Sequence, residues 1–174
     1  GEFMKRIIAS DIHGSALYCG RLIEHIRAER ADGLILLGDI LYHGPRNALP
    51  DGYDPKAVAD MLNALECRVV CVRGNCDSEV DQMLLKFPIM ATYALMDIGE
   101  SVVYMTHGHV NGREDPPRLR RGDVLLCGHT HIPADEMLPC GIRYVNPGSV
   151  AIPKGGSERG YILLENGEFV HKAL

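Results

Sequence analysis

The stretch KRIIASDIH, residues 5–13, joins a short apolar run to two polar side chains. The run is too short for a helix and is rich in isoleucine, which predicts a buried strand. Asp11 and His13 stand two positions apart where this strand ends, so both can project to the same side. The stretch therefore predicts a strand that delivers a carboxylate and an imidazole to one edge of a sheet.

Four more short apolar runs repeat this pattern, and each ends in polar groups. The runs span residues 34–37, 69–72, 102–106 and 124–127. In open α/β sheets, the carboxyl ends of the strands surround the ligand crevice. Segments that lie dozens of residues apart could therefore converge on one site.

Helical periodicity separates the first three runs. Ser15 can cap a helix that extends to about Arg30, with apolar residues every three or four positions. Pro55 stands at the start of a second helix, and Ser78 can cap a third that extends through Leu85. The first half is thus a β-α-β-α-β-α series.

The second half is mostly strands, because helical periodicity largely stops after Pro88. The strand-like segments are 92–97, 102–106, 124–127, 135–138, 143–145, 161–164 and 168–171. Strands that first alternate with helices and then follow one another predict an α/β fold with a two-sheet β-sandwich flanked by helices. One doubly wound parallel sheet fits this order less well.

The length of 174 residues fits one domain of roughly 100–200 residues, and no break in composition divides the chain. We expect a single domain over residues 4–174, with residues 1–3 before Met4 as a remnant of expression. A chain of this size buries about 70% of its unfolded surface, so it folds without a structural metal. Any metal would be there for chemistry.

Composition and charge limit the classes of binding partner and the cellular location that we expect. A formal charge of −5 provides no basic footprint for long nucleic acid, so a small phosphate-containing substrate fits better. No apolar run approaches the roughly 18 residues of a membrane span and no signal peptide is recognised, which predicts a cytoplasmic protein without membrane contact. The six cysteines lack zinc-knuckle or CxxC spacing and are expected to be reduced thiols. Phe87, Pro88 and Met90 could form a contact face in a homo-oligomer.

A series of polar motifs marks the five strand ends. The motifs are Asp11-Ile12-His13, Gly38-Asp39, Gly74-Asn75-Cys76-Asp77, His107-Gly108-His109 and Gly128-His129-Thr130-His131. Carboxylate, amide and imidazole ligands suit Mn, Fe or Zn better than they suit a soft thiolate site. Each motif alone has an ordinary explanation, since a lone histidine is usually packed or at the surface and Asn after Gly marks a turn. The whole series, with every motif at a strand end, predicts a metal site.

The motif series D-x-H, GD, GNxD, HGH and GHTH resembles that of the calcineurin-like metallophosphoesterases, from Asp11 to His131. Three longer strings are similar to those of the bacterial YfcE-type phosphodiesterases. These strings are HGPRNALP at 43–50, GNCDSEVDQM at 74–83 and NPGS at 146–149. The fold implied by the resemblance, a β-sandwich of two sheets flanked by helices, agrees with the strand pattern.

The resemblance also implies a set of ligands for two divalent metal ions. It assigns Asp11, His13 and His131 to one ion, Asn75, His107 and His129 to the other, and Asp39 to both. Manganese is the expected metal by this resemblance, with zinc, iron, nickel and cobalt as alternatives.

Two divalent ions about 3.5–4 Å apart can polarise a phosphoryl group and lower the pKa of a bridging water, which then attacks as hydroxide. The expected function is therefore hydrolysis of small phosphodiesters, without a serine or cysteine nucleophile. Two alternatives stay open. One is phosphomonoester hydrolysis at the same site, and the other is a non-catalytic metal-binding scaffold, because a retromer subunit resembles this family yet acts as a scaffold.

The candidate catalytic residues are Cys76, Asp77 and His109. Many metallophosphoesterases resemble GNH followed by an acid, and that histidine can protonate the leaving oxygen. Cys76 replaces it here, and a thiol with a pKa near ~8.5 is a poor substitute for imidazole. The departure favours diesters with good leaving groups, or His109 as the acid. Cys76 could instead be a small wall residue with no proton role.

The candidate substrate-binding residues are His43, Arg46 and Asn47, in a loop stiffened by three prolines. Arg46 could clamp a phosphate through two parallel hydrogen bonds. An ordinary surface turn with a solvated arginine explains the loop as well. Ser149 and Lys154 could form another wall of the pocket, although turn chemistry also accounts for them.

Overall fold

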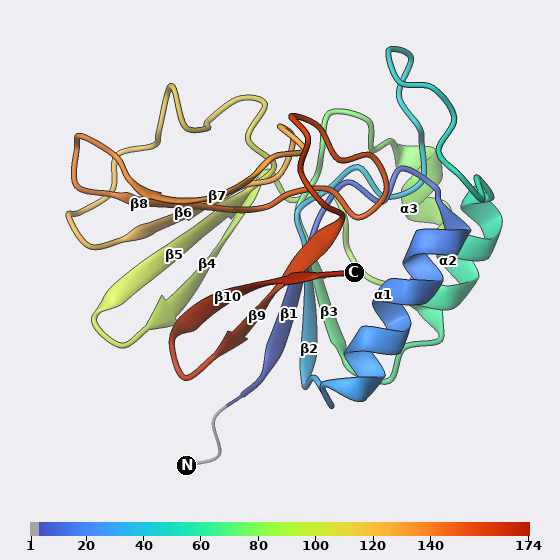
Figure 1. The fold of residues 1–174 in the computed structure, drawn as a ribbon, viewed down its shortest axis with the longest axis horizontal. Helices are drawn as coiled ribbons and strands as arrows, with labels where there is room; N and C mark the ends of the chain where they lie inside the picture. The colour runs from blue at the N-terminus through green and yellow to red at the C-terminus, as the bar shows by residue number, and fades with distance from the viewer. Residues whose placement is uncertain (1–3) are drawn as a thin grey trace.

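Two five-stranded sheets lie face to face in the computed structural model, which describes residues 4–174 (Figure 1). The expected expression remnant at residues 1–3 lies outside the described residues. The elements in chain order are β1 (Arg6–Ala9), α1 (Ala16–Ala28), β2 (Gly33–Leu36), α2 (Pro55–Asn63), β3 (Arg68–Cys71), α3 (Glu79–Leu84), β4 (Tyr93–Ile98), β5 (Ser101–Thr106), β6 (Val124–Leu126), β7 (Pro133–Met137), β8 (Arg143–Pro147), β9 (Gly160–Glu165) and β10 (Glu168–Ala173).

Both sheets are mixed, and parallel strands form their centres. The first sheet has the order β10-β9-β1-β2-β3, with β1, β2 and β3 parallel to one another. The second has the order β4-β5-β6-β8-β7, with β5, β6 and β8 parallel. Parallel strands end at the same edge of a sheet, so the loops that follow them gather at one end of the sandwich.

Alternating side chains of β1 divide the interior into two layers. Ile7 packs toward α1 and α2, whereas Ile8 packs toward the second sheet, because successive strand residues point to opposite faces. Both side chains are fully buried, and each such burial stabilises the fold by about 1.5–3 kcal/mol. The last three residues of β1, Ile7–Ala9, are therefore apolar and buried, because both faces of the strand are covered there.

Side-chain caps begin the three helices, and two of them, Ser15 and Ser78, are those predicted from the sequence. The Ser15 side chain accepts the N–H of Tyr18 at the start of α1, and Asp54 accepts the N–H of Ala57 before Pro55. Ser78 and Asp81 form a capping box at the start of α3. These bonds satisfy N–H groups that the first helical turn leaves without partners.

The structure confirms the two-sheet fold, with the helical cover on one side. Helices α1 and α2 pack on the outer face of the first sheet (Figure 1). The outer face of the second sheet instead carries a small apolar cluster around Leu125 and Tyr144, on which Leu119 of the β5–β6 connection packs. Within residues 4–174, no helix combines the length and the apolar character that crossing a bilayer requires. The six cysteines, all in this range, are free thiols.

Candidate metal centre

The polar motifs predicted from sequence meet where parallel strands of both sheets end. Asp11 and His13 follow β1, Asp39 follows β2, Asn75 follows β3, His107 follows β5, and His129 and His131 follow β6. Three of these strands belong to the first sheet and two to the second. The cluster therefore lies between the two sheets and takes side chains from both.

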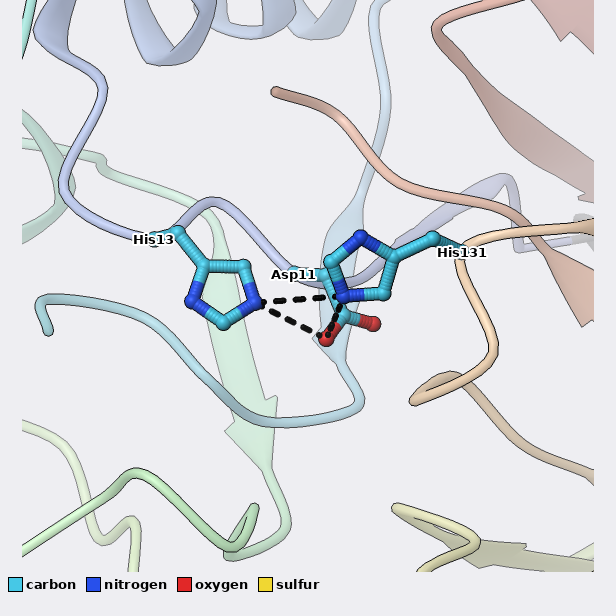
Figure 2. Close-up of side chains that lie close together, drawn as sticks. All are labelled: Asp11, His13 and His131. Carbon is cyan, nitrogen blue, oxygen red and sulfur yellow. Dashed lines mark hydrogen bonds and ion pairs between the residues drawn. The ribbon is translucent and has the colours of Figure 1, made fainter. Parts of the chain in front are cut away.

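Asp11, His13 and His131 form the first group of ligand-type side chains (Figure 2). The Nε2 atoms of His13 and His131 lie 3.3 and 3.2 Å from Asp11 Oδ1, and 3.3 Å from each other. All three residues are buried. Figure 2 shows the side chains of Asp11 and His13, from the segment after β1, converging with that of His131, from the segment after β6.

Asp39, His107 and His129 form the second group. His107 Nε2 lies 3.2 Å from Asp39 Oδ2 and 3.2 Å from His129 Nδ1. The Asn75 amide oxygen lies 3.1 Å from the same His129 nitrogen. Asp39 Oδ2 is also 3.7 Å from His13 Nε2, so this carboxylate lies between the two groups.

Backbone carbonyls fix the orientation of three imidazoles. Nδ1 of His13 donates to the carbonyl of Tyr42 at 2.8 Å, and Nδ1 of His107 donates to that of Leu37 at 2.6 Å. Nδ1 of His131 donates to Ile152 O at 2.5 Å. A carbonyl only accepts, so each Nδ1 carries the hydrogen. In the neutral imidazole each Nε2 then presents a lone pair to the cluster, as metal-binding histidines do.

The two groups are suited to bind cations, because they contain buried carboxylates and an acceptor oxygen that has no hydrogen-bond donor. Asp11 Oδ1 is buried and has no hydrogen-bond donor, although two imidazole Nε2 atoms lie near it. Burial lowers the pKa of His107, but Asp11 and Asp39 outweigh this effect and raise the pKa to about 9. The carboxylates thus concentrate negative charge in a buried space, where a bound cation would offset the cost of burial.

Five residues of the cluster adopt the left-handed backbone conformation, which residues other than glycine rarely adopt. Their φ angles are 57° at Asp11, 48° at His13, 57° at Asp39, 69° at His129 and 62° at His131. This conformation costs roughly 1–2 kcal/mol per residue. Such strain gathers at functional sites, where the surrounding structure holds it in place.

Two glycines allow the close approach of chains at the cluster. A Cβ atom on Gly74 would lie 2.1 Å from Asp39 Oδ1, and one on Gly128 would lie 2.0 Å from Ser10 Oγ. That hydroxyl donates to Asp11 Oδ2 at 2.6 Å. Both contacts are far shorter than a side chain tolerates, so the positions of both carboxylates require glycine at these places.

Two further side chains, those of Asp77 and Ser149, hold the backbone that carries the cluster. The Asp77 carboxylate accepts the backbone N–H groups of Asp39, Ile40 and Gly74 at 2.9, 3.0 and 2.7 Å. Burial raises the pKa of Asp77 to about 6. Ser149, expected as a pocket wall, is fully buried and donates to the carbonyl of Asp11 at 2.8 Å. Ser149 belongs to the NPGS string at residues 146–149, but its hydrogen-bond partner Asp11 lies 138 residues away in the sequence.

The other candidate catalytic residues lie beside the cluster. The Cys76 N–H donates to Asp39 Oδ1 at 2.9 Å, and its sulfur is within 4.8 Å of ligand atoms of His13 and Asp39. Burial and the nearby Asp39 raise the pKa of the Cys76 thiol to about 12. His109 is exposed, and its ring centre is 5.4 Å from that of His107 and 6.0 Å from that of His129. Burial and His107 lower its pKa.

A cavity of about 950 Å³ opens beside the cluster. Arg46 and Asn47 line it, and the Asn47 amide donates to the carbonyl of His43 at 2.8 Å. The His43 ring packs against the rings of Tyr42 and Tyr53, with centres 4.7 and 5.4 Å away. The structure thus brings two of the three candidate substrate-binding side chains to the cavity wall and places the third in an aromatic cluster behind it.

A sandwich of two mixed sheets that carries paired groups of carboxylates and imidazoles at its strand ends defines a metallophosphoesterase. Residues 4–168 match the calcineurin-like phosphoesterase superfamily domain, and the chain belongs to that superfamily. Within it, the chain is 50% identical to the phosphodiesterase YfcE of Escherichia coli strain K12 over 163 residues, which are 94% of this chain and 88% of the relative. These findings confirm the resemblance seen in the motifs.

Solved structures agree with this assignment. The structure of YfcE, a phosphoesterase from E. coli, has a TM-score of 0.90 at 45% identity and covers 98% of this chain and 99% of its own. Wild-type Vps29 from Entamoeba histolytica, solved with Zn²⁺, has a TM-score of 0.57 at 17% identity and covers 97% of both chains. The similarity to Vps29 shows the fold alone.

We predict that Gly74→Ala weakens metal binding and leaves the fold intact. The added Cβ displaces Asp39, and loss of such supporting geometry typically costs about 10- to 100-fold in metal affinity. Calorimetric titration with Mn²⁺ measures the affinity, and far-UV circular dichroism reports the fold. The matched control is Gly20→Ala, in α1, where the nearest atom is 4.0 Å away. Unchanged Mn²⁺ affinity in Gly74→Ala would contradict the argument.

Proposed function

We propose that this chain is a dinuclear metal-dependent phosphodiesterase that hydrolyses small phosphodiesters. The observation that carries the proposal is the pair of ligand groups with the Asp39 carboxylate between them. Identity of 50% to a protein named as a phosphodiesterase supports a diester as the substrate. Manganese is the proposed metal, and the expected cytoplasmic location and self-association stay predictions.

The ligand assignment follows from the two groups. Asp11, His13 and His131 would hold one ion, Asn75, His107 and His129 would hold the other, and Asp39 would contact both. When bound, two divalent ions supply Lewis acidity toward the phosphoryl oxygens and lower the pKa of the attacking water. The chain's own contribution is to fix the ligands, to shape the cavity and to bind the diester.

Asp77 acts as a positioning residue in this proposal. Its carboxylate is engaged by three backbone N–H groups and touches the loop that carries Asp39. It therefore joins the segment after β2 to the segment after β3. This contact fixes the position of the Asp39 backbone, and so of its side chain, between the two ligand groups. A role in proton transfer is left to His109, which is exposed at the rim of the site.

Arg46 is proposed to bind the scissile phosphate. Its side chain is exposed and lines the cavity. The loop that carries it is hydrogen-bonded to the segment that follows β1. The Ser15 hydroxyl donates to Asp51 O at 2.6 Å, and the N–H of Asp54 donates to Gly14 O at 2.8 Å. A guanidinium held on a fixed loop can form two parallel bonds to phosphate oxygens.

Asp39→Asn is expected to abolish turnover and to reduce the bound manganese. Replacing the shared ligand should lower kcat/KM by more than about 100-fold, beyond what loss of an outer partner costs. Rates on bis(4-nitrophenyl) phosphate and 4-nitrophenyl phosphate, with metal analysis by mass spectrometry, test this and separate diester from monoester hydrolysis. Asp60→Asn, at an exposed carboxylate paired with Lys56 on α2, is the control. An active, fully metallated Asp39→Asn enzyme would refute the shared-ligand role.

For Cys76→Ala we expect rates within about threefold of wild type, with an unchanged dependence on the leaving-group pKa. The thiol lines the cavity and is proposed to be a wall residue without a part in proton transfer. The measurement is kcat for aryl methyl phosphates with leaving groups of graded pKa. A steeper slope in the variant would instead assign proton donation to the thiol.

Arg46→Ala is expected to raise KM for a simple diester about tenfold, because a charge-assisted bidentate contact is worth about 1.4 kcal/mol or more. Steady-state kinetics with methyl 4-nitrophenyl phosphate measure it. Arg27→Ala, on the far helix α1, provides a control of the same chemistry. If Arg46→Ala retains both wild-type constants, the arginine does not bind the phosphate.

A further inference from the structure

The cavity beside the cluster is larger than one phosphate group requires. Its volume of about 950 Å³ lies near the top of the range of roughly 300–1,000 Å³ that holds drug-sized ligands. One wall comes from the β2–α2 loop with Arg46, and another comes from the β8–β9 loop with Lys154. Both loops lie at the upper side of the molecule in Figure 1. The space beyond the metal ligands can therefore hold a substantial alcohol group of a diester.

Arg46 and Lys154 are the two cations among the residues that line this cavity. The ion pairs that lysine and arginine form elsewhere in residues 4–174 involve Lys5, Lys56, Arg113, Arg143 and Lys172. Neither cavity cation belongs to that set. Both residues are exposed and line the cavity, and neither forms one of these ion pairs.

Two acidic residues outside the ligand set, Asp77 and Asp81, also line the cavity, and both are already engaged. Asp77 accepts three backbone N–H groups beneath the cluster. Asp81 accepts the N–H of Ser78 at 3.2 Å in the capping box of α3. These carboxylates are therefore tied to the backbone, and the ammonium of Lys154 is left for a ligand.

The backbone of Lys154 is held against a metal ligand. Its N–H donates to the carbonyl of His131 at 3.1 Å, and two positions earlier Ile152 accepts Nδ1 of the same histidine at 2.5 Å. The Ser157 hydroxyl and N–H donate to the carbonyl of Lys154 at 2.5 and 3.1 Å. The segment that orients His131 thus also carries Lys154, which fixes where the lysine leaves the wall.

The two cations suit different tasks. The planar guanidinium of Arg46 matches the oxygens of one phosphate, whereas an ammonium on a flexible stem acts as a point charge that reaches a more distant anion. The other lining residues outside the ligand set include the polar Asn47, Ser78 and Thr130 and the apolar Pro45 and Val80. The polar side chains can hydrogen-bond to an alcohol group, and the charge of Lys154 favours an anion on it.

We propose that Lys154 is a specificity residue that binds a second anionic group on the alcohol portion of the substrate. The preferred substrates would then be small phosphodiesters in which one esterified alcohol also carries a carboxylate or phosphate. This inference rests on the proposed phosphodiesterase function. It adds a contact that is separate from the metal ligands and from the scissile phosphate.

Two diesters with the same leaving group and similar size test the proposal: propyl 4-nitrophenyl phosphate, and 2-carboxyethyl 4-nitrophenyl phosphate. In the manganese-loaded enzyme, Lys154→Met should lower kcat/KM for the carboxylate diester about fivefold, mainly through KM, because an exposed ion pair is worth up to about that factor. The propyl diester should be unaffected. Lys154→Arg should retain the preference, and 0.5 M salt should reduce it.

Equilibrium binding provides a readout that does not depend on turnover. The manganese-loaded enzyme is titrated calorimetrically with 3-phosphonopropionate and with propylphosphonate. The two compounds are similar in size and share the phosphonate, but only the first also has a carboxylate. Wild type should bind the carboxylate compound more tightly, and Lys154→Met should lose the difference. Lys56→Met, at an exposed lysine on α2, is the matched control and should keep it.

The outcomes separate the inference from the function on which it rests. If wild type hydrolyses the propyl diester but Lys154→Met leaves the carboxylate preference intact, the Lys154 contact is wrong and the phosphodiesterase stands. An equal fall on both diesters would place Lys154 on the scissile phosphate and also overturn the inference. If wild type hydrolyses neither diester, both proposals fail together.

Discussion

The buried carboxylate of Asp11 is the contact on which the rest of the site depends. One oxygen accepts the Ser10 hydroxyl and the N–H of His129, which ties the end of β1 to the end of β6 in the other sheet. The second oxygen faces two imidazoles and has no donor. Its backbone carbonyl accepts Ser149 from the loop before β9. A charge buried in this way is costly without a counter-ion, so the residue that joins the two sheets also creates the demand for a cation.

Backbone groups, rather than side-chain partners, orient the imidazoles of this site. Carbonyls of the chain hold Nδ1 of His13, His107 and His131, and this leaves each Nε2 facing the cluster. The left-handed residues at the cluster cost energy, and the apolar layers on either side of the first sheet supply the stability that offsets it. Precise ligand placement is thus a consequence of the two-layer core.

The same fold occurs in the phosphodiesterase YfcE and in Vps29. The distinction must therefore lie in the side chains that the strand ends present, and not in the sandwich itself. In this chain both groups of ligand-type side chains are present, and a cavity lined by two cations adjoins them. In the proposed function the ligand groups would account for reaction at a phosphate. The cavity wall, with Arg46 and Lys154, is the proposed basis for the choice among phosphates.

The sequence by itself determined the types and order of the elements, the two-sheet class and the residue types of the ligands. These follow from hydrophobic periods, caps and short motifs, which are local. The motif resemblance grouped Asp11 with His131, but only the tertiary structure shows how they meet, because strand order and register bring together residues that lie far apart in the chain. It also placed both covering helices on one sheet, placed His43 in an aromatic cluster, and joined the backbone of Lys154 to that of His131. Local patterns carry no information on such contacts, since they depend on which distant backbone groups meet once the sheets have packed.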